Sequence, residues 1–148
     1  MSHLLSKDTF DHFYFIEASI KMGVSYQIQG RINEGFYDTS VEQTLNREFC
    51  YWKEIRHRIF DIIKGKRLPL SCKIVLGLSK QSISYLIAHN NSSFSEEDIE
   101  GIYVNILYDP KNLLITTGIS YKNFSLDKSL EYAFDEYLAK FLKEKAVI

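Results

Sequence analysis

Alternating apolar and polar residues predict five β-strands in this chain, at residues 14–22, 26–33, 71–78, 102–108 and 115–121. The first two are separated by a short break at Gly23, and the last two by the turn-forming sequence from Asp109 to Asn112. Each of these pairs is expected to form a hairpin. Because hairpins join antiparallel strands, the sheet is predicted to be mainly antiparallel.

Apolar residues three and four positions apart predict the helices. The longest is expected at residues 39–64, where Thr39 and Glu42 form a capping box and Gly65 ends the helix. The predicted order of elements is α-β-β-α-β-α-α-β-β-α, so the fold class is α+β with the helices packed on one face of the sheet. The remaining helices are expected before residue 14, at 79–91, at 95–101 and at 127–145.

Size and composition indicate one globular domain over residues 1–148. With 45% hydrophobic and 25% charged residues, the chain can bury a core without metal or disulfide staples. Neither Cys50 nor Cys72 has a Cys or His partner at metal-ligand spacing, so no metal and no cofactor is expected. A formal net charge of −1 makes nucleic acid an unfavoured partner. The free cysteines, the polar N-terminus and the lack of a long apolar run predict a cytoplasmic protein without a membrane segment.

Short stretches spread along the chain resemble those of a known family. These stretches are Ser6, Asp8–Asp11, Glu17–Ser19, Gly35–Thr39, Ile63–Lys66, Tyr108–Asp109, Thr116–Gly118 and Leu126–Glu131. They resemble a family of bacterial proteins that is catalogued only as a domain of unknown function. The resemblance covers nearly the whole chain and implies a single-domain unit, but it brings no activity, substrate or site residue. Because members of that family begin with an additional strand-like segment, it also implies that the sheet here can lack one edge strand.

A charged pair lies on the apolar face of the predicted long helix. Glu48 and Arg56 fall inside the arc of apolar side chains, on either side of Trp52. An arginine that faces a core needs a partner, because an unpaired buried charge is strongly destabilising. The candidate partners are Glu48, Glu17 of the first strand, or a carboxylate or phosphate of a ligand. The favoured interpretation is a structural ion pair, or an arginine whose stem carries its charge past the edge of the helix, and a ligand pocket lined by Trp52 is the alternative.

Two further clusters are weaker candidates for function. Cys50 and His57 could pair as a thiolate nucleophile and its base, but both are otherwise isolated, and the chain has no phosphate-binding loop, dinucleotide fingerprint or nucleophile elbow. Basic residues near the end of the long helix could contact nucleic acid, although cations at a helix C-terminus are favoured without any partner. These residues are Lys53, His57, Arg58, Lys64, Lys66 and Arg67.

The sheet face away from the helices is expected to be half polar, with rings and aliphatic side chains among the polar groups. Such a surface suits a protein partner or a second copy of the chain. The favoured function is therefore a non-catalytic binding or protein-interaction domain. The alternatives are an anionic-ligand binding protein or enzyme with a pocket near Arg56 and Trp52, and weak nucleic-acid binding. The expected residues of this face are Glu17, Ser19, Lys21, Gln27, Gln29, Arg31, Lys73, Asn105, Thr116 and Ser120, with Phe15, Tyr103, Val75 and Leu107 among them.

Overall fold

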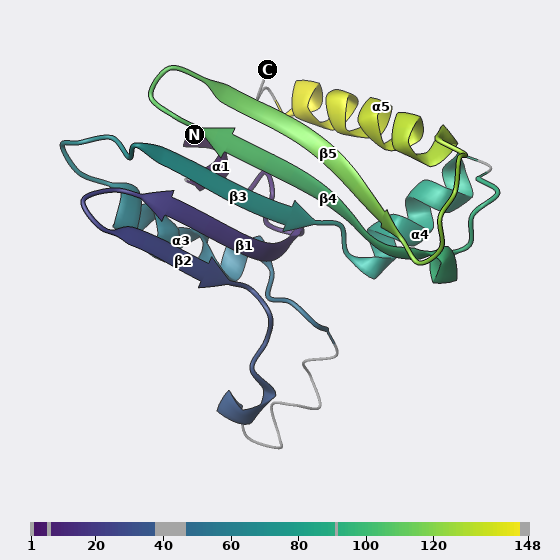
Figure 1. The fold of residues 1–148 in the computed structure, drawn as a ribbon, viewed down its shortest axis with the longest axis horizontal. Helices are drawn as coiled ribbons and strands as arrows, with labels where there is room; N and C mark the ends of the chain where they lie inside the picture. Colours follow the sequence, from purple (N-terminus) through teal and green to yellow (C-terminus); the bar gives the residue numbers. More distant parts are fainter. Residues whose placement is uncertain (1, 6, 38–46, 91, 146–148) are drawn as a thin grey trace.

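The computed structural model describes residues 2–5, 7–37, 47–90 and 92–145, which form an antiparallel sheet with helices behind it (Figure 1). The sheet has five strands in the order β2-β1-β3-β4-β5, and every neighbouring pair is antiparallel. The predicted α+β class and the predicted order of elements are confirmed. The strands are β1 (Tyr14–Lys21), β2 (Ser25–Gln29), β3 (Ser71–Gly77), β4 (Ile99–Tyr108) and β5 (Leu113–Tyr121).

The helices pack on one face of the sheet and enclose a single apolar cluster with it. They are α1 (Ser2–Leu5), α3 (Trp52–Ile63), α4 (Lys80–His89) and α5 (Ser129–Glu144), with 3-10 turns η1 (Glu34–Phe36) and η2 (Glu96–Asp98). Buried residues alternate with more exposed ones from Glu17 to Lys21 of β1 and from Ile102 to Leu107 of β4, whereas β3, in the centre of the sheet, is buried on both faces from Ile74 to Gly77. The cluster includes Phe15, Ile20, Ile74, Leu76, Ile102 and Val104 from the strands, and Leu4, Trp52, Ile59, Leu130, Phe134 and Leu138 from the helices.

A β-bulge in β1 reverses the predicted direction of one side chain. The pairing of β1 with β3 shifts between Phe15 and Glu17, so Ile16 is an extra residue in the ladder. Phe15 therefore faces the helices and is fully buried, whereas strict alternation predicted it on the sheet face away from the helices. Its ring packs against Trp52 at a centroid distance of 5.8 Å. The prediction for Phe15 is wrong because alternation alone cannot reveal a bulge.

The long helix begins later than predicted. Helix α3 starts at Trp52, and the chain just before it is extended, with Cys50 hydrogen-bonded on both sides. The Cys50 N–H donates to the Gly30 carbonyl at 2.9 Å, and the Cys50 carbonyl accepts from the Phe15 N–H at 2.8 Å. These long-range hydrogen bonds outweigh the helical period of the apolar residues. The predicted capping box at Thr39 and Glu42 lies outside the described residues.

The helix predicted at residues 95–101 is only the 3-10 turn η2, and β4 already begins at Ile99. The predicted cap is present, since the Asp98 carboxylate accepts a hydrogen bond from the Ser95 N–H at 2.8 Å. Gly101 does not end a helix but lies at a β-bulge of β4. The ring of Tyr103 occupies the space that a side chain at Gly101 would need. The glycine is therefore explained by close packing within the strand and not by a helix end.

Substitution of Gly30 tests whether its side-chain position is blocked by the backbone of a neighbouring strand. A Cβ atom there would lie 1.8 Å from the backbone oxygen of Phe15, whereas a Cβ at Gly118 meets nothing within 4 Å. Gly30→Ala should lower the free energy of unfolding by about 3 kcal/mol, since the backbone cannot yield as a side chain can. Gly118→Ala, the matched control, should change it by less than about 0.5 kcal/mol. Urea unfolding measures both, and equal midpoints for the two variants would contradict this packing.

Candidate functional site

The sheet face opposite the helices carries no helix in the described part of the chain and faces the viewer in Figure 1. Strand register places its residues in rows that cross the sheet. One row runs through Gln29, Glu17, Val75, Asn105 and Thr116. The next runs through Gln27, Ser19, Lys73, Leu107 and Leu114. We call this surface the open face, and its second row changes from polar at β2 to apolar at β4 and β5.

The apolar side chains of the open face are unevenly covered. Val75 lies in the centre of the sheet and is buried by its neighbours, whereas Leu107 and Leu114 are 38% and 54% exposed. The two leucines are cross-strand partners on β4 and β5, so they form one continuous patch. Further along β4, burial raises the pKa of the Tyr103 hydroxyl, and the Glu100 carboxylate adds to the effect. Tyr103 is therefore a neutral hydroxyl over the physiological pH range.

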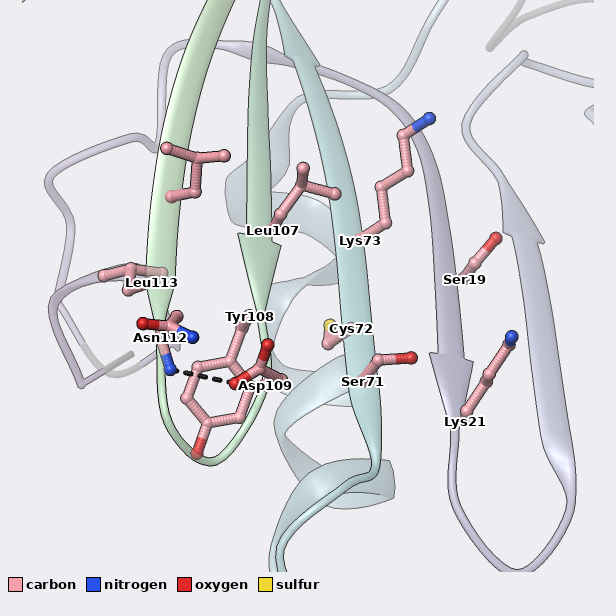
Figure 2. A pocket seen from close by; sticks show the side chains of 11 residues that line it. Ser19, Lys21, Ser71, Cys72, Lys73, Leu107, Tyr108, Asp109, Asn112 and Leu113 are labelled. Carbon is pink, nitrogen blue, oxygen red and sulfur yellow. Dashed lines mark hydrogen bonds between the residues drawn. The ribbon is translucent and has the colours of Figure 1, made fainter.

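A hollow of about 660 Å³ lies at the end of the open face nearest the β4–β5 turn, and Figure 2 shows the side chains that line it. Lys21 and Lys73 stand on one side of the hollow, and Leu107 with Leu114 on the other. Asp109 lies at the turn, where its carboxylate accepts hydrogen bonds from two backbone N–H groups of the turn at 2.8 Å and 2.9 Å. The hollow thus combines an apolar wall with a cationic wall.

Both lysines of the hollow lack an anionic partner among the described residues. The salt bridges in the described ranges involve Arg31, Arg47, Arg56 and Lys64, and neither Lys21 nor Lys73 appears in one. A lysine side chain can lay its aliphatic stem along a neighbouring apolar surface and present its ammonium group to a ligand. The arrangement can therefore receive a group that is apolar at one end and anionic at the other.

The structure does not bring the predicted ligand residues together. The Arg56 guanidinium binds the Asp11 carboxylate, with Nε 2.8 Å from Oδ1, so the predictions of Glu48 or Glu17 as its partner are wrong. Glu48 instead forms an exposed ion pair with Arg31. It leaves the arc around Arg56 because it precedes the real start of the helix. Glu17 lies on the open face of β1.

The two buried members of the predicted site have structural contacts. Trp52 is fully buried, and its indole N–H donates to the Leu4 carbonyl at 2.9 Å. Arg56 is 13% exposed and also donates to the Leu5 carbonyl at 3.3 Å. The charge of Arg56 is thus paired with Asp11, with a further hydrogen bond to α1, which agrees with the favoured interpretation of a structural ion pair. Asp11 was missed because a carboxylate 45 residues away carries no periodic signal that links it to Arg56.

The cysteine environments do not favour a thiolate. Burial raises the pKa of the Cys50 thiol, and the nearby Glu54 carboxylate adds to the effect. Burial alone raises the pKa of Cys72 to about 11. Both groups are therefore protonated thiols near neutral pH, whereas nucleophilic cysteines have a lowered pKa.

The basic side chains predicted as a nucleic-acid contact are exposed along and after α3. Two of them interact within the chain: Lys64 pairs with Asp61 at 3.0 Å, and the Lys53 ammonium lies 5.7 Å from the centre of the Tyr51 ring. Nucleic-acid binding by this segment stays a prediction.

Comparison with known families identifies what the chain is related to. Residues 3–148 match a family of unknown function, DUF5721. The chain belongs to this family. The predicted resemblance to a domain of unknown function is therefore confirmed, while the bacterial source stays a prediction. No curated protein and no solved structure matches the DUF5721 chain. The candidate site consequently rests on the geometry above.

Two absences hold for the described part of the DUF5721 chain. None of its helices has both the length and the apolar character needed to cross a bilayer. No group of three or more His, Cys, Asp and Glu residues is placed to hold a metal ion in those same ranges.

Removal of the carboxylate beside Arg56 should reveal a structural ion pair. Asp11→Ala is expected to lower the free energy of unfolding by about 2–3 kcal/mol, because it leaves a largely buried guanidinium without its charged partner. Glu48→Ala removes the exposed partner of Arg31 and should cost less than about 1 kcal/mol. Thermal or urea unfolding compares the two variants. A larger loss from Glu48→Ala would show that the wrong pair has been identified as structural.

Thiol labelling tests the cysteine environments. At pH 8 both cysteines should react with an aromatic disulfide reagent at least about tenfold more slowly in the folded chain than in urea, since the raised pKa values keep them protonated. Cys50→Ser and Cys72→Ser separate the two rates. Labelling of Cys50 faster in the folded than in the unfolded chain would instead indicate an activated thiolate.

Proposed function

We propose that the DUF5721 chain is a non-catalytic, cytoplasmic protein-interaction domain that binds a partner protein on its open face. The observation that carries this proposal is the exposed pair Leu107 and Leu114 beside Lys21 and Lys73, which form no salt bridge within the described ranges, on a face that no described helix covers. Exposed apolar patches rimmed by polar groups are typical of interaction sites.

The chemistry of the open face defines the partner. An apolar anchor, such as a leucine or an aromatic ring, would fill the hollow against Leu107 and Leu114. One or two carboxylates beside that anchor would meet Lys73 and Lys21. The flanking polar rows reach as far as β2 and offer a rim of amide and hydroxyl groups. A buried apolar centre inside a polar rim is the usual composition of a protein interface.

A second copy of the chain is the alternative occupant of the open face. A two-fold axis through the hollow and across the strands would bring its lysines against the same lysines of the other copy, where like charges repel, and an axis along the strands would bring them against leucines, which supply no counter-charge. A different, acidic partner avoids this repulsion. It is therefore the preferred occupant.

The alternative of an anionic-ligand site near Arg56 and Trp52 has less support than it had from the sequence. Arg56 is already held by Asp11, and Trp52 is buried against α1. Lys21 and Lys73, which have no salt-bridge partner among the described residues, line an apolar hollow on the open face, so an anionic group of a ligand is expected there.

Site-specific photo-crosslinking in cells that naturally produce the protein tests this proposal. A photoreactive residue in place of Leu107 should give a discrete adduct with another protein. The matched control is the same replacement at Tyr132, which is 66% exposed on α5, on the other side of the molecule. Only the Leu107 position should give the adduct.

Charge reversal supplies the second half of the test. Lys21→Glu together with Lys73→Glu should reduce the Leu107 adduct at least about tenfold, because the acidic part of the partner would be repelled. Equal adducts from Leu107 and Tyr132, or an adduct that survives charge reversal, would refute binding by the open face. An adduct of two identical chains would establish the homo-oligomer in place of the hetero-complex.

A further inference from the structure

The two edges of the sheet differ in how well they are protected against pairing with a strand of another chain. At the β2 edge the strand has five residues, and the chain beyond it is paired, because the Ile32 N–H donates to the Glu48 carbonyl at 2.9 Å. At the other edge β5 has nine residues and contains no charged residue and no proline. Proteins normally blunt a long edge strand with charges, proline, bulges or a covering element. The β5 edge therefore lacks both charges and proline, and it runs beside α5 (Figure 1).

The hairpin hydrogen bonds show which β5 groups point outward. Asp109 and Asn112 exchange two backbone hydrogen bonds, of 3.0 Å and 3.3 Å, so they form a hydrogen-bonded pair. Because such pairs alternate along an antiparallel ladder, the N–H and C=O groups of Leu114, Thr116 and Gly118 point toward β4. The backbone N–H and C=O groups of the residues in between point away from the sheet. These residues are Leu113, Ile115, Thr117 and Ile119.

A groove of about 660 Å³ lies along this edge, between β5 and α5. Side chains of Leu113, Ile115 and Thr117 form its strand side. Its helix side repeats at helical spacing, with Asp135 and Ala139 exposed and Leu138 and Leu142 buried. The exposed small side chain of Ala139 leaves the groove open in its middle. An edge strand beside a helix is the arrangement in which extended peptides add to a sheet.

Asp135 gives the groove a single charge. Its carboxylate accepts a hydrogen bond from the Thr117 hydroxyl, which fixes it over the middle residue of β5. No other charged side chain lines the groove among the described residues. A cationic side chain opposite Thr117 would therefore find a carboxylate that is already held in place.

We propose that an extended segment of a partner protein adds to β5 as a sixth, antiparallel strand in this groove. From N- to C-terminus, the segment has a lysine or arginine opposite Thr117, then apolar residues opposite Ile115 and Leu113, with any residue between them. The outward N–H and C=O groups of β5 bind its backbone, and Asp135 selects its cation. Among the described residues the groove shares only Leu113 with the hollow of the open face, and neither Lys21 nor Lys73 lines it, so this inference does not rest on the proposed function.

Charge disfavours a second copy of the chain as the added strand. Antiparallel pairing of two β5 strands about Thr117 would place the two Asp135 carboxylates on the same side of the extended sheet, close to the two-fold axis. β5 has no cation of its own to offset this repulsion. A cationic segment would pair with the Asp135 carboxylate of the groove, whereas a second β5 strand has no cation to do so.

Binding of a designed peptide to the full chain tests the proposal. The probe is Thr-Lys-Thr-Ile-Thr-Leu-Thr with blocked ends and a fluorescent label, and its control is the same sequence written backwards. Fluorescence anisotropy should show saturable binding of the probe at least about tenfold tighter than that of the reversed peptide. Hydrogen exchange should slow on binding at the outward amides of Leu113, Ile115 and Thr117. Absence of saturable binding, or equal binding of both peptides, would overturn the proposal.

Three variants locate the binding. Asp135→Lys should weaken probe binding at least about tenfold and make the peptide with glutamate in place of lysine the tighter ligand. Glu136→Lys changes the same charge at the next, exposed position outside the groove and should alter affinity less than about threefold. Ala139→Trp should fill the groove and abolish binding with an unchanged melting temperature. An unchanged affinity in Asp135→Lys or Ala139→Trp would overturn the site.

Two further measurements separate the outcomes. Sedimentation should show a monomer, and a dimer that Ala139→Trp dissociates would show that β5 pairs with itself, which overturns the hetero-segment. The open-face variant Lys21→Glu with Lys73→Glu should bind the probe as the unsubstituted chain does. The edge proposal and the open-face proposal can therefore fail independently.

Discussion

The short extended segment before α3 is the constraint on which the rest of the structure depends. The Cys50 backbone forms hydrogen bonds with Phe15 of the first strand and with Gly30 just after the second. The Trp52 N–H donates to the Phe13 carbonyl at 2.8 Å. These bonds fix where α3 begins and which of its faces meets the sheet. The same docking places Arg56 beside Asp11, while Phe15 itself leaves no room for a side chain at Gly30. These three backbone hydrogen bonds therefore decide the helix boundary and the position of the largely buried ion pair.

Because the helices gather on one face, the sheet is left with two unequal exposed regions. The open face changes from amides and carboxylates near β2 to leucines near β5. The β5 edge is long and uncharged, and α5 lines it without covering it. Both regions meet at Leu113, which lines the hollow and the groove. Interaction chemistry is thus concentrated at one side of the sheet, whereas the opposite edge strand, β2, is short and the chain that follows it pairs with the segment before α3.

Much of the fold was predictable because its signals are local. The alternation in β1 to β5 and the turn at Asp109 predicted the sheet and its two hairpins, and a half-buried surface imposes a period of two on the sequence. The family resemblance was predictable from short stretches spread along the chain. The site was less predictable: Lys73 and Leu107 were expected on the open face, but nothing in the sequence showed that they border one hollow with Lys21 and Leu114.

By itself the sequence determined the fold class, the strands and the half-polar character of one sheet face, because each of these follows from neighbours within a few residues. Only the tertiary structure decided that Phe15 turns inward, that α3 starts at Trp52 and that Arg56 meets Asp11. It alone also decided that α5 leaves a groove beside β5. The reason is common to all four: each depends on hydrogen bonds or packing between segments far apart in the chain, and such contacts leave no periodic trace in the sequence.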